Sequence, residues 1–249
     1  MKFYSRNWYY IGGILFVIMS FVMGFFGDGV SQIEKILIFS FMSLLVHQFE
    51  EYGLPGGFPA FFNVIMNGEK EAPDRYPQNS QLAMVVNVVL AYPFYMAAII
   101  FSDAIWLGLA TMYFGFSQIL MHGIVMNRKL KSFYNPGLAA SIFLHGPIGV
   151  YYTWYVTTHD LAGTWDYIAG IIAMIAAAVI IVALPIKLFS SRQAKYPFSQ
   201  EEMERFGMSE KAKRLSEPMR VQKSNTFCFC FIIMYRSEQG GHLARCKIL

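Results

Sequence analysis

Long apolar segments alternate with short polar ones over residues 1–189 of the chain. A helix that crosses a bilayer needs about 20 mostly apolar residues. Six segments meet this requirement: 8–26, 33–51, 82–101, 104–126, 137–156 and 165–189. Pro93, Pro147 and Pro185 fall inside three of them, and membrane helices tolerate proline because neighbouring groups satisfy the freed carbonyls. The pattern predicts an all-α, polytopic membrane bundle of about six transmembrane helices.

The first apolar segment follows Lys2 and Arg6, as the apolar core of a secretory signal peptide would. It is long for a signal peptide, however, and no small-residue cleavage site follows it. We therefore expect a helix that is retained in the mature protein.

Basic residues of this region gather on one side of a six-helix arrangement. They precede helix one, separate helices two and three and helices four and five, and lie at or beyond the end of helix six: Lys2, Arg6, Lys70, Arg75, Arg128, Lys129, Lys131, Lys187, Arg192 and Lys195. Lys35, in the first turn of the second helix, is the exception, and its long side chain can reach the interface. Because cytoplasmic loops are enriched in Lys and Arg, both termini are predicted to be cytoplasmic, in a bacterial inner membrane.

Two stretches lie outside the six helices. Residues 52–81 are rich in Gly and Pro around an apolar run too short to span, and both an interfacial and a re-entrant placement fit. After residue 189 the chain becomes charged, which divides it into a transmembrane bundle (1–189) and a partly disordered cytoplasmic tail (190–249). All three cysteines, Cys228, Cys230 and Cys246, lie in that tail, so no cysteine metal site is predicted in the bundle.

Composition supports the membrane class. The chain is 55% hydrophobic and 14% charged, whereas soluble domains carry about 25% charged residues. The net charge of +4 is weak and scattered, so nucleic acid is not an expected partner. The expected partner is the lipid bilayer.

The segment HQFEE places a histidine and two carboxylates at the end of an apolar helix. At about 100° per residue, Glu51 lies about 40° to one side of His47 and Glu50 about 60° to the other. Imidazole and carboxylate are ligands for zinc, iron or manganese. The three residues therefore form half of a candidate metal site, in which Glu50 or Glu51 is also the candidate catalytic base.

The missing ligands are predicted from later helices. His122 lies near the end of the fourth helix and His145 near the start of the fifth, both on the cytoplasmic side with His47. Gln118, four residues before His122, shares its face. Each histidine could alternatively be a packing residue, and the glutamates could mark where the helix leaves the lipid. Ionisable residues inside a membrane bundle are nevertheless costly, which favours a functional interpretation of the set.

The segment YNPG (134–137) begins the fifth helix, because proline is favoured in a first turn. Tyr134, Pro136 and Gly137 thus follow the histidine motif, with Tyr134 expected near the mouth of the pocket. With HQFEE, Gln118 and His122, and YNPG in this order, the chain resembles the HXXEE family of small bacterial membrane proteins over about 36–156. Gln118 stands where the family pattern leads us to expect asparagine. The resemblance implies a metal-binding active site and carries no assigned reaction.

Three classes of function fit these residues. The first is a metal-dependent enzyme, a hydrolase or an oxidoreductase with zinc or iron, acting on a lipid or another apolar substrate. The second is a proton-coupled transporter that uses His47, Glu50 and Glu51 as a relay. The third is an assembly protein of the membrane without chemistry of its own.

Overall fold

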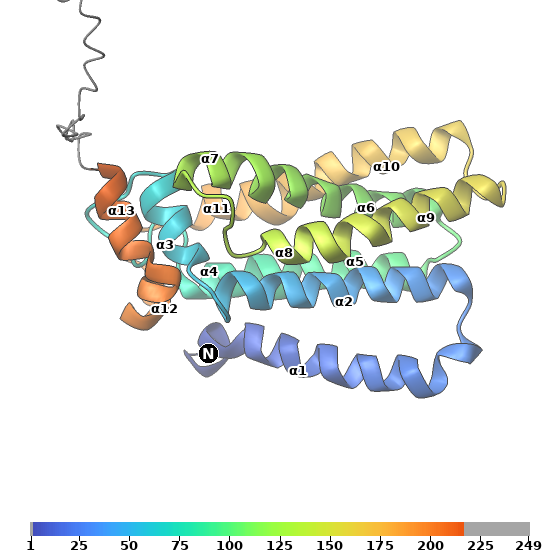
Figure 1. Cartoon of the computed structure of the whole chain (residues 1–249), viewed down its shortest axis with the longest axis horizontal. Helices are drawn as coiled ribbons and strands as arrows, with labels where there is room; N and C mark the ends of the chain where they lie inside the picture. Colours follow the sequence, from blue (N-terminus) through green and yellow to red (C-terminus); the bar gives the residue numbers. More distant parts are fainter. Residues whose placement is uncertain (1, 217–249) are drawn as a thin grey trace, which may run out of the picture. The chain divides into compact units, whose positions relative to one another are not determined.

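Six long helical rods run through residues 2–189 of the computed structural model, which describes residues 2–216 of the chain (Figure 1). They are α1 (Lys2–Phe26); α2 (Gln32–Tyr52); α4 (Ser80–Met84), η3 (Val85–Leu90) and α5 (Ala91–Ile100); α6 (Ile105–Leu120), η4 (Met121–Met126) and α7 (Asn127–Leu130); α8 (Leu138–Ala140), η5 (Ser141–His145) and α9 (Gly146–Thr158); α10 (Thr164–Ala177), η6 (Ala178–Ala183) and α11 (Leu184–Phe189). No strand occurs in the part of the chain that is described, so the all-α prediction is confirmed. The rods match the six predicted segments, although α1 begins at Lys2 rather than at residue 8.

Four helical stretches are long and apolar enough to cross a membrane among the residues that the structure describes. They are Phe3–Gly29, Ser80–Ile100, Ile105–Leu130 and Thr164–Phe189. The other two rods, α2 and α8–η5–α9, carry polar residues that the bundle buries, among them His47, Glu51 and Ser141. Because α2 packs against α1, α5, α8 and α9, much of its surface meets protein and can be polar.

Three of the rods widen into a π-helical turn just before a proline. The residues four positions before Pro93, Pro147 and Pro185 lie within η3, η5 and η6, respectively. A proline ring clashes with the carbonyl four residues earlier and removes a hydrogen bond, and a local π turn accommodates both effects. No proline follows η4 in its rod, so its π turn has another cause. Such turns occur frequently at functional sites.

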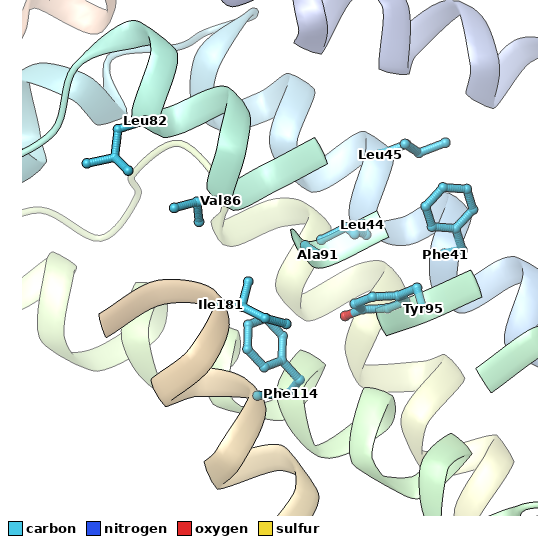
Figure 2. Close-up of a cluster of buried hydrophobic side chains, with 10 residues drawn as sticks. Phe41, Leu44, Leu45, Leu82, Val86, Ala91, Tyr95, Phe114 and Ile181 are labelled. Carbon is cyan, nitrogen blue, oxygen red and sulfur yellow. The ribbon is translucent and has the colours of Figure 1, made fainter. Parts of the chain in front are cut away.

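A buried apolar cluster joins four rods (Figure 2). Its labelled members come from α2, α4–η3–α5, α6 and η6: Phe41, Leu44, Leu45, Leu82, Val86, Ala91, Tyr95, Phe114 and Ile181. Five of its members also line the cavity described below: Leu44, Val86, Ala91, Phe114 and Ile181.

Short helices close one end of the bundle. They are α3 (Phe58–Ala60), η2 (Phe61–Met66), α12 (Gln200–Glu204), η7 (Arg205–Gly207) and α13 (Met208–Ser216). Arg205 ties this layer to the rods, because its guanidinium donates to the hydroxyls of Tyr9 (3.1 Å) and Tyr10 (3.0 Å) and to the backbone carbonyl of Tyr52. The apolar run of the 52–81 segment is thus a short helix packed against α12 and α13.

The last rod ends at Phe189, and the compact unit that contains the rods extends to Ser216. The extension follows from burial, because Phe198 and Met208 lie in apolar clusters with residues of the rods. Residues 217–249, with the three cysteines of the predicted tail, lie outside the described residues.

Candidate metal centre

The helix α2 carries the first two members of a buried group of ligand-type side chains. His47 and Glu51 are one helical turn apart and share a face, so that His47 Nε2 lies 3.7 Å from Glu51 Oε1. Both side chains are buried. A carboxylate in such a position needs compensating partners, because an unpaired buried charge is costly.

The π turn η4 brings the third member, His122. Its Nε2 lies 3.3 Å from the same oxygen of Glu51, and its ring stands nearly perpendicular to that of His47, with the centroids 4.8 Å apart. Each of His47, Glu51 and His122 offers one potential metal-ligand atom, and these three atoms lie within 4.8 Å of one another. These three residues, which we call the His–Glu–His group, could hold a metal ion.

Hydrogen bonds on the far side of each ring orient the two imidazoles. Nδ1 of His47 lies 3.1 Å from the backbone oxygen of Gly137, and Nδ1 of His122 lies 2.7 Å from Oδ1 of Asn135. Both oxygens can only accept, so we assign the proton of each neutral ring to Nδ1. Each Nε2 then presents a lone pair toward Glu51.

Asn135 is itself held in one orientation. Its amide nitrogen donates to the backbone oxygen of His122 (2.8 Å) and to Oδ1 of Asn127 (2.7 Å), which leaves Oδ1 to face the ring of His122. Metal-binding histidines commonly have such a partner on the second ring nitrogen, because it sets the tautomer and the ring direction.

Gly137 supports both rings at once. Its φ of 100° lies in the left-handed region, which glycine adopts readily, and its carbonyl accepts from His47. A Cβ at this position would come within 2.3 Å of Cε1 of His122. The backbone of the YNPG segment therefore forms part of the wall behind the His–Glu–His group.

Glu50, predicted as a ligand and a base, points elsewhere. Its carboxylate accepts from the Tyr134 hydroxyl (2.7 Å) and from the backbone N–H groups of Ala139 (3.1 Å) and Ala140 (2.8 Å). A carboxylate at the first turn of a helix satisfies N–H groups that have no partner within the helix. Burial and the bond to Glu50 raise the pKa of Tyr134. Glu50 and Tyr134 thus join α2 to the start of α8, and Tyr134 lies in a cleft with Glu50 rather than beside the imidazoles.

His145 lies next to the group without being one of its three members. The side chain is buried, and its ring centroid is 5.5 Å from that of His47. Its Nε2 has no hydrogen-bond partner. The ring packs against Gly115, where a Cβ would come within 3.0 Å of Nδ1. The structure brings together His47, Glu51 and His122 from the predicted set and leaves His145 and Glu50 beside them.

A cavity of about 410 Å³ adjoins the His–Glu–His group. Gln118, which shares a helix with His122 as the spacing indicates, also lines it. Most of the remaining wall is apolar, and five of its residues are visible in Figure 2: Leu44, Val86, Ala91, Phe114 and Ile181. The group thus borders an apolar cavity of the size usual for small-molecule sites, roughly 300–1,000 Å³.

Three contributors to the site are absent from the sequence-based prediction. The sequence gives no reason to assign Asn135 to the site, nor Ser141, which donates to the Gly137 carbonyl (2.6 Å). The third contributor is the cavity wall formed by η3 and η6. The sequence of these two elements does not reveal it, because apolar residues are equally common in lipid-facing helices. The position of Asn135 beside Pro136 and Gly137 is the one signal that could have drawn attention to it.

Comparisons with known proteins agree with the motif. Residues 38–152 match the family described as "Protein of unknown function with HXXEE motif", and this segment contains His47, Glu51, His122 and the YNPG turn. No curated protein matches the chain. No solved structure matches it either. The match over residues 38–152 confirms the resemblance to the HXXEE family, whose function is unknown.

Proposed function

We propose that this protein is a membrane-embedded metalloprotein in which His47, Glu51 and His122 bind one divalent transition metal, zinc or iron. The observation that carries the proposal is the direction of the two imidazoles. Each has its N–H on an accepting oxygen, so two nitrogen lone pairs and one carboxylate meet in a buried space. Three electron-rich groups repel one another there unless a cation lies between them.

The distances fit this assignment. Ligand atoms lie about 2.0–2.2 Å from zinc, so two ligands of one ion are at most about 4.4 Å apart. The separations of 3.7 Å and 3.3 Å from Glu51 Oε1 to the two imidazoles meet this limit. Three protein ligands with a further position open toward a cavity are typical of catalytic rather than structural zinc sites. A bound metal of this kind supplies an acidic water or polarises a carbonyl oxygen.

We assign different roles to the surrounding residues. Glu51 is a ligand, whereas Glu50 positions α2 against α8, because its oxygens are already engaged by three donors. Asn135 and Gly137 orient the imidazoles. Gln118 lines the cavity, and we assign it to the binding of a substrate there.

We further propose that all six rods cross the bilayer, with both termini in the cytoplasm of a bacterial cell. The support is the placement of Lys and Arg in alternate connections, together with the exposed apolar side chains of α1 and α10, such as Phe21, Val22, Ile172 and Ile175. A topology reporter fused after Phe189 should give a cytoplasmic signal. A periplasmic signal would rule out six spans.

The activity we propose is that of a metal-dependent enzyme acting on an apolar substrate, since the cavity beside the ligands is largely apolar. A proton relay for transport is the competing function. A second proton would make His122 a cation, and this cation would also compensate the negative charge of Glu51. The relay requires no metal, so metal content separates the two.

The test is elemental analysis of the purified protein in detergent. We expect about one zinc or iron per chain in the wild type and little in His47→Ala or His122→Ala, because losing one ligand greatly weakens a metal site. His145→Ala is the matched control, since it also removes a buried imidazole and should retain the metal. A wild type that takes up neither metal, even when loaded with it, would refute the metalloprotein.

A further inference from the structure

The cavity beside the His–Glu–His group has an opening on one side. Of the described residues that line it, only Met121 and Ala183 are exposed. They belong to the candidate spans Ile105–Leu130 and Thr164–Phe189. The exposed rim of the cavity therefore lies on two helices that are apolar enough to be surrounded by lipid.

The packing of these two helices explains the opening. The helices α6 and α10 lie against each other over much of their length, and at Gly170 a Cβ would approach Leu109 within 2.9 Å. Past this contact the rods continue as η4 and η6, which do not pack extensively against each other. The exposed rim residues Met121 and Ala183 thus lie on η4 and η6, where the two rods make few contacts.

The polar end of the cavity favours a particular kind of head group. Among the described lining residues there is no Lys or Arg, the side chains that usually recognise phosphate. Gln118 lines this end four residues before His122, and none of the hydrogen bonds found among the described residues involves its side-chain amide. An amide N–H pairs with a carbonyl or carboxylate oxygen, and such an oxygen is also a ligand for zinc or iron.

We infer that the cavity binds a single fatty acyl chain, which enters from the bilayer between Met121 and Ala183 and brings its carboxyl or carbonyl oxygen to the His–Glu–His group. The position of the head group rests on the proposed metal site. The position of the chain rests on the apolar wall formed by Leu44, Val86, Ala91, Phe114 and Ile181 (Figure 2).

The experiment is photo-crosslinking in phosphatidylcholine vesicles with a palmitic acid that carries a diazirine near its chain end. We expect labelling of peptides that contain Phe114 or Ile181, and we expect excess palmitate to suppress it. Labelling confined to lipid-facing positions such as Ile172 and Ile175, or insensitive to palmitate, would overturn the inference.

A matched pair of substitutions tests the opening. Ala183→Trp fills the rim and should reduce palmitate-sensitive labelling at least about tenfold, because excess volume is poorly accommodated in a packed site. Ala176→Trp places the same side chain at an exposed position of the same rod outside the cavity and should leave the labelling unchanged. Equal loss in both variants would contradict the proposed route. Ala178→Leu, a smaller change inside the cavity, provides a second test if Ala183→Trp does not fold.

Metal content, measured on the same samples, separates this inference from the proposed function. Labelling of the cavity in a protein that binds no metal would support the acyl site and refute the metalloprotein. Stoichiometric metal without palmitate-sensitive labelling would support the metalloprotein and refute the acyl site.

Discussion

Glu50 and Glu51 are adjacent on α2 and almost equally buried, at 8% and 6% exposure, yet their surroundings differ completely. Glu50 accepts three hydrogen bonds from Tyr134 and the first turn of α8. Glu51 instead has two imidazole nitrogens at 3.3 Å and 3.7 Å. A carboxylate with three donors is stable as an anion, whereas one that faces two lone pairs needs a cation. Burial alone therefore does not identify a functional carboxylate, and the chemistry of its neighbours does.

The same substitution at both positions should give the largest difference. Glu51→Gln should lower metal affinity by more than about 100-fold, because it removes a charged ligand. Glu50→Gln should keep the metal and lower the free energy of unfolding by about 1–3 kcal/mol, since one accepting oxygen is lost. Elemental analysis and thermal unfolding measure the two effects. Similar metal loss in both variants would end the distinction between the two carboxylates.

Gly137→Ala should have the next largest effect. The new Cβ would lie 2.3 Å from the ring of His122, so the ring has to move and metal binding should be lost. Gly68→Ala is the control, because Gly68 also has a positive φ (68°) but no atom within 4 Å of a new Cβ. The control should show only backbone strain, about 1–2 kcal/mol. If both variants keep the metal, Gly137 does not position His122.

Asn135→Ala should weaken metal binding by about 10–100-fold, the usual effect of losing the partner behind a ligating histidine. Asn135→Asp retains an accepting oxygen toward His122 and should recover part of the affinity. Metal titration with a competing chelator measures both. An unchanged affinity in Asn135→Ala would show that the hydrogen bond does not set the tautomer of His122.

Tyr134→Phe should have the smallest effect, and it tests the other side of the comparison. It removes one of the three donors to Glu50 and should lower the free energy of unfolding by about 1.5 kcal/mol, with metal content unchanged. Chemical unfolding followed by tryptophan fluorescence provides the measurement. Loss of metal in this variant would mean that Glu50 and Glu51 are not independent.

The sequence by itself determined the helices and the residues of the half-site. Apolar runs of about 20 residues predict the rods closely, because each depends on local composition. His47 and Glu51 are four residues apart, which puts them on one face of any helix. The order of HQFEE, Gln118 with His122, and YNPG also suffices to predict the match of residues 38–152 to the HXXEE family.

Only the tertiary structure decided which of the two adjacent glutamates meets His122. The helical rotation of α2 places Glu50 and Glu51 on opposite sides of His47 and favours neither. The choice depends on α8, whose first-turn N–H groups donate hydrogen bonds to the carboxylate of Glu50. It also depends on the π turn η4, which carries His122. Both partners lie more than 70 residues further along the chain, and no local pattern encodes the position of a helix relative to one so distant.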